Sequence, residues 1–271
     1  MRPHALYVLR VTSGEEIRLA LTLHYDGSAF FGWQSQRQER TVQGELEAAV
    51  ERLTGARRAV TGSGRTDRGV HATGQVAAVS VPARWTPQSF RKAMNAILPD
   101  DVWVRDVRAV PASFHPRFDA VGRTYLYRLG LDEEARSPFL RRWCWCIRPS
   151  LDRGLLEDAA AVIVGGHSFA AFAKAGQPER GTRCAVRSTL WEPWNGLGLT
   201  FTITADRYLH HMVRYLVGTM VDIARGARPL ADLPTLLECG PEPGRETSPP
   251  APARGLFLAA VEYPEKSLAH S

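Results

Sequence analysis

Alternating apolar and polar side chains near the start of the chain predict a strand over residues 17–25. The apolar side chains recur with the period of two that places them on one face of a sheet: Leu19, Leu21, Leu23 and Tyr25. Other alternating or continuously apolar segments have the length of strands. They predict further strands over residues 75–81, 102–107, 123–131, 197–205 and 256–263.

Apolar side chains spaced three and four residues apart predict four helices, over residues 41–53, 89–98, 151–164 and 209–225. In the first, Thr41 can cap the start and Gly55 suits the end, and Pro99 stops the second. The helix over 209–225 has the most regular apolar stripe: Leu209, Met212, Val213, Leu216, Val217, Met220, Val221 and Ala224. Five prolines in residues 240–254 predict a loop.

The order of strands and helices repeats along the chain and predicts two α/β units, over residues 17–118 and 119–263. Leu21 to Asp26 weakly resembles Leu199 to Thr204, as a duplicated unit would. Residues 1–16 and 264–271 are expected to be loosely ordered tails.

Composition adds a polyanion-binding hypothesis to this scheme. The chain is 44% hydrophobic and 23% charged, as in soluble globular proteins, and no apolar run approaches the ~20 residues of a membrane span. The start is a poor signal peptide, so we expect a cytoplasmic protein without a membrane partner. The net charge is +6, and only three of the 34 basic side chains are lysine. Arginine pairs with phosphate and stacks on bases, although a GC-rich genome would favour it equally.

Candidate chemistry is concentrated in residues 62–75, Gly-Ser-Gly-Arg-Thr-Asp-Arg-Gly-Val-His-Ala-Thr-Gly-Gln. Four glycines indicate a sharply bent backbone that allows close approach. The bend carries Asp67, Arg65, Arg68 and His71. A surface turn with solvated charges would have the same pattern. It is neither a P-loop nor a dinucleotide fingerprint, because no Gly-Lys-Ser/Thr follows and a strand rather than a helix comes next.

Two kinds of chemistry fit this segment. Asp67 and His71 could hold a metal, but no third ligand is clustered nearby, and His210 and His211 on a helix would point about 100° apart. We therefore expect no metal. Alternatively, an ionised Asp67 could attack as a nucleophile, since a free Asp has a pKa near 3.9. Arg214, on the polar side of the 209–225 helix with His210, could offset its burial.

Residues Gly64 to Ala72, Gly-Arg-Thr-Asp-Arg-Gly-Val-His-Ala, closely resemble the catalytic motif of the tRNA pseudouridine synthase A family. Arg68 stands where that motif usually has alanine, and we expect activity to survive the difference. The resemblance extends from about Leu19 to Tyr263. Its other matches are Tyr25-Asp26-Gly27 with Phe31-Gly32-Trp33-Gln34, Thr41-Val42-Gln43-Gly44, Asn95-Ala96-Ile97-Leu98-Pro99, Phe114-His115-Pro116-Arg117-Phe118, Arg123-Thr124-Tyr125-Leu126-Tyr127, and Leu209-His210-His211-Met212-Val213-Arg214 with Val217-Gly218.

The resemblance implies an activity and a fold. The activity is isomerisation of uridine to pseudouridine at positions 38, 39 and 40 of the tRNA anticodon stem-loop, by a homodimer without a cofactor. The fold is α+β: two similar α/β halves share a central mixed, mostly antiparallel sheet flanked by helices, the pseudouridine synthase fold.

The resemblance also implies residue roles. Asp67 matches the nucleophile, Arg65 a residue that helps extrude the target nucleotide, Tyr125 a residue packed on the target base, and Arg214 the basic partner of the aspartate. Period-two spacing puts Arg123 and Tyr127 on the same strand face as Tyr125, so we expect one cleft to receive all three. Without the resemblance, Tyr125 reads as a core tyrosine. The expected RNA contacts are Phe114, His115, Pro116, Arg117 and Phe118 and, from a loosely matching loop, Arg180 and Arg183.

Two other functions remain open on the residues alone. An Arg-rich RNA chaperone without catalysis would bind tRNA in a salt-dependent way but leave uridine unchanged. A metal-dependent phosphoesterase using Asp67 and His71 would cut RNA and be inhibited by a chelator. Two points of mechanism are also open: whether Asp67 attacks the ribose C1′ or the uracil C6, and whether Tyr125 removes the C5 proton.

Overall fold

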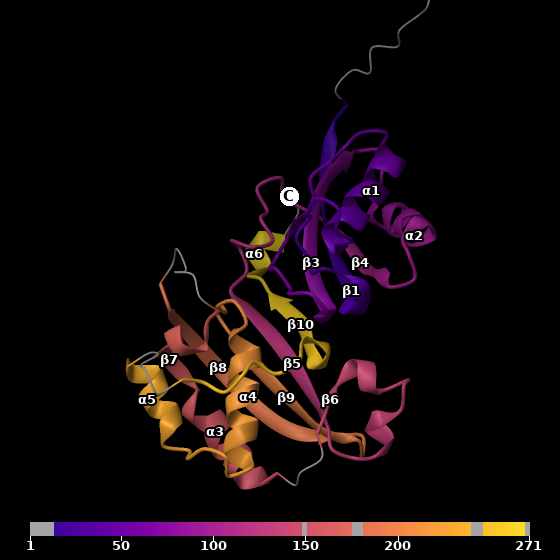
Figure 1. Ribbon diagram of the computed structural model, residues 1–271. Coiled ribbons are helices and arrows are strands. Elements are labelled where there is room, and N and C mark those ends of the chain that lie inside the picture. Colours follow the sequence, from indigo (N-terminus) through magenta and orange to yellow (C-terminus); the bar gives the residue numbers. More distant parts are fainter. Residues whose placement is uncertain (1–13, 148–150, 175–180, 240–245, 269–271) are drawn as a thin grey trace, which may run out of the picture.

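The strands form one mixed sheet that runs through the whole molecule (Figure 1). The computed structural model describes residues 14–147, 151–174, 181–239 and 246–268. The strand order is β4-β1-β3-β10-β5-β9-β8-β7, with β2 paired to β3 and β6 paired to β5. Within the described residues, pairing is parallel between β10 and β3 and between β5 and β6, and antiparallel elsewhere. The predicted class, α+β with a mixed and mostly antiparallel sheet, is confirmed.

The first half of the chain supplies one end of this sheet, with two helices beside it (Figure 1). Its elements are β1 (Glu16–Tyr25), α1 (Val42–Thr54), β2 (Thr61–Gly62), β3 (His71–Pro82), α2 (Pro87–Ile97) and β4 (Val102–Val110). The Thr41 hydroxyl accepts the Gly44 N–H at 3.2 Å, and Gly55 ends α1 with φ +76°. Both predicted ends of α1 are therefore confirmed.

The second half supplies the other end of the sheet, with three helices beside it (Figure 1). Its elements are β5 (Gly122–Gly130), β6 (Trp145–Cys146), α3 (Arg153–Val162), β7 (Gly165–Ser168), β8 (Arg183–Trp194), β9 (Gly198–Ala205), α4 (Met212–Ala224) and α5 (Asp232–Cys239). The apolar stripe predicted for α4 is fully buried, as expected. However, α4 begins at Met212, three residues later than predicted.

A strand from the end of the described chain joins the two halves. β10 (Leu256–Glu262) lies between β3 and β5, parallel to the first and antiparallel to the second. Its Phe257 and Leu258 are opposite His71 and Ala72 of β3. One hydrophobic cluster extends through both halves, and the junction is therefore part of the core.

The expectation of loose tails is corrected at two points. β1 already begins at Glu16, and Glu265–Leu268 form a short helix, α6. Leu268 packs on the small cluster that contains Phe114, which gives α6 an apolar contact. The rest of the predicted tails, residues 1–13 and 269–271, lies outside the described residues. Among the helices that are described, none combines the length and the apolar character that crossing a membrane requires.

Candidate active site

Asp67 lies in the loop between β2 and β3, and buried hydrogen bonds hold that loop in place. The hydroxyls of buried Thr66 and Tyr25 lie 2.8 Å apart, and the Thr66 carbonyl accepts the Trp33 N–H at 3.0 Å. Gln75 Nε2 donates to the Gly64 carbonyl at 2.9 Å. Because these bonds are shielded from water, breaking any of them leaves an unpaired buried group. The position of the Asp67 backbone is therefore tightly specified.

Gly32 lets a second segment approach the backbone of this loop. Its φ of +95° lies in the region that favours glycine, and a Cβ there would lie 2.6 Å from the Thr66 carbonyl oxygen. The next residue, Trp33, makes the hydrogen bond to that same carbonyl. The Phe-Gly-Trp segment singled out in the sequence thus braces the peptide that precedes Asp67.

Three side chains from the second half surround the Asp67 carboxylate. His210 Nε2 lies 3.1 Å from Oδ1, His211 Nε2 3.2 Å from Oδ2, and Arg214 Nη1 3.8 Å from Oδ2. The expected proximity of Arg214 to Asp67 is therefore observed. Arg214 Nε also donates to the Ala251 carbonyl at 2.7 Å, which fixes its guanidinium. Positive charge at such distances stabilises a carboxylate anion.

The two histidines correct a sequence-based expectation. They do not diverge on a helix, because both precede Met212, and His211 caps α4 with φ +67°. This left-handed residue turns the chain so that both imidazoles face Asp67. The pKa of His211 is lowered mainly by burial and further by Arg214 and His210, with Asp67 opposing. At neutral pH, Arg214 therefore supplies the permanent positive charge and His211 is neutral.

Asp67, His210 and His211 could also hold a metal. Their ligand atoms lie within 4.8 Å of one another, which corrects the expectation that no third ligand is near Asp67. Arg214 Nη1 lies 3.4 Å from His211 Nε2 and 3.8 Å from Asp67 Oδ2. A metal cation bound here would therefore meet a positive charge that is already in contact with two of its ligands.

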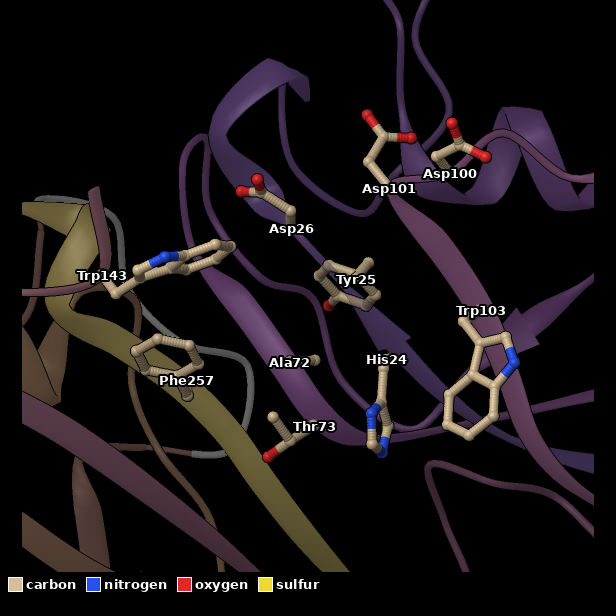
Figure 2. Close-up of a pocket in the computed structure, with 10 residues that line it drawn as sticks. All are labelled: His24, Tyr25, Asp26, Ala72, Thr73, Asp100, Asp101, Trp103, Trp143 and Phe257. Atoms are coloured by element: carbon tan, nitrogen blue, oxygen red, sulfur yellow. The ribbon is translucent and has the colours of Figure 1, made fainter. Parts of the chain in front are cut away.

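His71, the other candidate partner, faces away from this cluster. It is fully buried, its Nδ1 lies 3.2 Å from Asp26 Oδ1, and its ring stacks on Phe257 at 4.7 Å. The same Nδ1 accepts the Gly27 N–H at 3.0 Å, so His71 is held beside Asp26 rather than beside Asp67. Figure 2 shows a cavity of about 220 Å³ beside this cluster, between Trp143 and Phe257 on one side and His24 and Trp103 on the other.

Arg123, Tyr125 and Tyr127, which were expected to face one cleft, have three different environments. Tyr125 is 8% exposed and packs edge-on to Tyr208 with ring centroids 4.9 Å apart. Burial raises its pKa to about 12, with Arg123 opposing and Asp67 contributing, so the phenol stays protonated at neutral pH. Arg123 Nη2 donates to the Ser63 carbonyl at 2.7 Å. Tyr127 is fully buried and donates to the Pro252 carbonyl at 2.8 Å, so it belongs to the core rather than to a cleft.

Two of the expected RNA contacts in residues 114–118 are corrected. Phe114 is 2% exposed and belongs to a core cluster, and Pro116 is buried. Only the other residues of this segment reach the surface. Phe118 is 59% exposed and stacks on His115 at 4.2 Å, and Arg117 is exposed beside it.

The remaining predicted contacts are arginines. Arg65 is exposed in the Asp67 loop, and Arg68 is exposed on the other side of Asp67. Arg183 is exposed at the start of β8 and donates to the Gly166 carbonyl at 2.8 Å. Arg180 lies outside the described residues.

Comparison with known proteins gives a consistent result. A family model described as tRNA pseudouridine synthase matches residues 21–119 and 159–264. A tRNA pseudouridine synthase A from Geobacter sp. (strain M21) is 37% identical over 253 residues, covering 91% of this chain and 99% of its own. Its counterpart from Moorella thermoacetica is 39% identical over 247 residues, covering 90% and 99%.

A third relative, the tRNA pseudouridine synthase A of Solidesulfovibrio magneticus, is 41% identical over 258 residues, covering 91% of each chain. Solved structures are much more distant. The archaeal box H/ACA sRNP Nop10-Cbf5 complex aligns with a TM-score of 0.35 and 9% identity, covering 76% of this chain and 43% of that one. A likeness of that size supports no argument.

Proposed function

The chain belongs to the tRNA pseudouridine synthase family, and from that membership we propose that it converts uridine to pseudouridine at positions 38, 39 and 40 of the tRNA anticodon stem-loop. The reaction is an isomerisation: the bond from C1′ to N1 breaks, the uracil rotates, and a bond from C1′ to C5 forms. The proton leaves C5, and N1 gains one. No atom is added or lost overall.

Asp67 is the proposed nucleophile in this reaction. The observation that carries the proposal is the setting of its carboxylate, which is 24% exposed, braced by a buried loop and surrounded by Arg214 and two imidazoles. A nucleophilic carboxylate has to be ionised and held within reach of an electrophilic carbon. The neighbouring guanidinium favours the anion, and the braced loop limits its movement. This geometry fits attack at either C1′ or C6.

The target uridine has to leave the base stack to reach Asp67. Unstacking costs a few kcal/mol, which a side chain filling the gap and a ring stacking on the flipped base can offset. We assign the filling of the gap to Arg65, which is exposed two residues before Asp67. Tyr125 is the proposed stacking ring: it is buried against Tyr208, close enough to Asp67 for the carboxylate to raise its pKa. Its raised pKa supports a role in stacking rather than in removing the C5 proton at neutral pH, because a neutral phenol is a weak base.

The Asp67→Asn variant tests the nucleophile. It keeps the shape of the side chain and removes the charge, so we expect turnover to fall by about 10⁴-fold or more, with tRNA affinity within about threefold of wild type. Carbodiimide labelling of tRNA before and after incubation detects the product, and primer extension locates it. Turnover of Asp67→Asn near the wild-type rate would contradict the nucleophile, and labelling outside positions 38–40 would contradict the site.

A second function, metal-dependent cleavage of RNA, has one observation in its favour: the cluster of Asp67 with His210 and His211. It predicts loss of activity in excess EDTA and shortened RNA on a denaturing gel. The proposed isomerase predicts full turnover in EDTA and RNA of unchanged length. A chaperone without catalysis predicts binding alone, with no labelled product.

Homodimerisation and a cytoplasmic location are further parts of the proposal. They are supported by the resemblance and by the composition of the chain. Sedimentation equilibrium of the full chain would measure its mass in solution, and a monomer at the concentrations used for the activity assay would contradict the dimer.

A further inference from the structure

A second cavity, of about 370 Å³, is lined by three arginines from separate parts of the chain. Arg68 follows Asp67 in the loop before β3, Arg142 lies in the 3-10 helix Arg141–Trp143, and Arg254 lies in the 3-10 helix Ala253–Gly255. The other lining residues are small or lack charge: Ser28, Gly69, Pro252 and Ala253. Three guanidinium groups around one small space favour an anion.

Each guanidinium is oriented by a neighbour. The Arg68 guanidinium lies over the Phe31 ring at 4.1 Å, and Arg254 Nε donates to the Cys144 carbonyl at 3.1 Å. Arg142 lies over the Trp143 ring at 4.9 Å and pairs with Asp26. A guanidinium has five N–H donors, so one hydrogen bond or a stacked ring leaves donors for a ligand. Holding these side chains beforehand lowers the entropy lost on binding.

The charge of the cavity remains positive after its neighbours are counted. Burial opposes ionisation of Asp26, but hydrogen bonding to His71 and Ser28 outweighs it and holds the Asp26 pKa well below its ordinary value. The ionised Asp26 offsets one of the three arginines. Acidic rather than basic side chains line the cavity in Figure 2: Asp100, with Asp26 and Asp101 paired to Arg142 and Arg40. A negatively charged ligand is therefore directed to the arginine cavity.

The arginine cavity also adjoins the Asp67 site. Arg68 is the next residue to Asp67, and a Cβ on Gly69 would touch the Ala253 Cβ at 3.4 Å. On the other side, Arg214 is bonded to the carbonyl of Ala251, two residues before Ala253. The arginine cavity therefore borders the loop that carries Asp67.

From these observations we infer that the arginine cavity binds one backbone phosphate of the RNA, next to the nucleotide that enters the Asp67 site. The inference rests on the proposed function for the identity of the RNA. Arg68, which stands where the catalytic motif of similar proteins usually has alanine, is then a binding residue that this chain adds. Arg142 and Arg254 complete the site from the second half.

Single methylphosphonate linkages test this inference, because each replaces one charged phosphate by a neutral group. We would measure binding of anticodon stem-loop RNAs, each with one such linkage, to wild type and to R68A/R254A. In wild type, one linkage next to the target should weaken binding by roughly tenfold. In R68A/R254A, native RNA should bind about as weakly, and that linkage should have no further effect. The slope of log affinity against log salt should fall by about one.

Two controls make the outcome specific. R153A removes an exposed arginine that is paired with Glu157 on α3, and it should retain the wild-type pattern with every linkage. R68K/R254K restores the two positive charges that R68A/R254A removes, and it should recover part of the RNA affinity. Equal sensitivity of wild type and R68A/R254A at every linkage would overturn the inference. Because binding is measured without turnover, that result differs from failure of the proposed function, in which wild type would bind RNA but form no product.

Discussion

The two halves of the molecule contribute different things to one site. The first half holds the carboxylate of Asp67 in a loop fixed by Tyr25, Trp33 and Gln75. The second half brings Arg214 and the two histidines at the start of α4. One half therefore supplies position and the other supplies charge. Neither half contains the whole of the proposed site, and the sheet that joins them brings its two parts together.

Removing the charge from the second half should have the largest effect. Arg214→Ala takes away the cation beside Asp67 and should lower turnover by about 10²–10³-fold. Arg214→Lys keeps a charge but cannot also make the bond to the Ala251 carbonyl, so its loss should be intermediate. Single-turnover rates with tRNA in a double-mutant cycle with Asp67→Asn measure the coupling. Fully additive effects on the rate would show that Asp67 and Arg214 act independently. That result would contradict a single site shared by the two halves.

Displacing the loop from the first half should mainly affect stability. In Gly32→Ala, a methyl group 2.6 Å from the Thr66 carbonyl and an unfavourable φ of +95° should reduce the free energy of unfolding by roughly 2–4 kcal/mol. Gly55→Ala is the matched control, because Gly55 also has a positive φ, +76°, but nothing within 4 Å of the added Cβ. It should cost about 1 kcal/mol. Urea unfolding measures both, and equal costs would show that the contact with Thr66 is unimportant.

Removing the Tyr25 hydroxyl tests whether the hydrogen bond to Thr66 affects turnover as well as stability. Tyr25→Phe leaves Thr66 without a buried partner and should cost about 1–2 kcal/mol of stability. Thr189→Val removes a bond of similar length, to the Ala160 carbonyl at 2.9 Å, in the second half and away from the Asp67 loop. We expect thermal shifts of similar size in both variants, but a lower turnover number only in Tyr25→Phe. Full turnover in Tyr25→Phe would show that the hydrogen bond between Tyr25 and Thr66 is not needed for catalysis.

The smallest expected effect concerns His211 and pH. Since the pKa of His211 is lowered in the folded protein, the unfolded chain binds a proton first as the pH falls below about 6.5. Folding stability from this residue is therefore complete above that pH and is lost as the pH falls through the lowered pKa. His211→Gln should lose less stability than wild type between pH 7 and pH 5. Parallel thermal-stability curves for the two proteins would refute the assignment.

Most elements of the fold were predictable because each depends on local periodicity. The cap at Thr41, the end at Gly55 and the stripe of α4 are all readable from spacing. β8 was not predicted, since Arg187, Glu192 and Pro193 interrupt its alternation, and it is buried on one side only. The helix α5, eight residues long, carried too short a pattern to be recognised.

The candidate site was predictable to a different degree. Asp67 and Arg214 were singled out from the residues themselves and given their roles by resemblance to a family, but spacing alone could not have placed them together. The histidines were misjudged because their direction depends on one left-handed residue, His211, which no periodicity reveals. Phe114 was misjudged for the opposite reason: a matching motif was taken to be surface, although an aromatic residue there fills the core. The signal that could have revealed them is the pair of adjacent histidines, His210 and His211, directly before the start of α4 at Met212.

The place of β10 has a consequence for how the protein is made. Residues 256–262 are synthesised after both β3 and β5, yet they fill the gap between those two strands (Figure 1). Until they do, each of those strands has an unpaired edge, the feature that invites association with other nascent chains. The Asp67 loop and the start of α4 also cannot be held together by this strand before that moment. The proposed site should therefore form only after residues 256–262 have been made, in a single closing step.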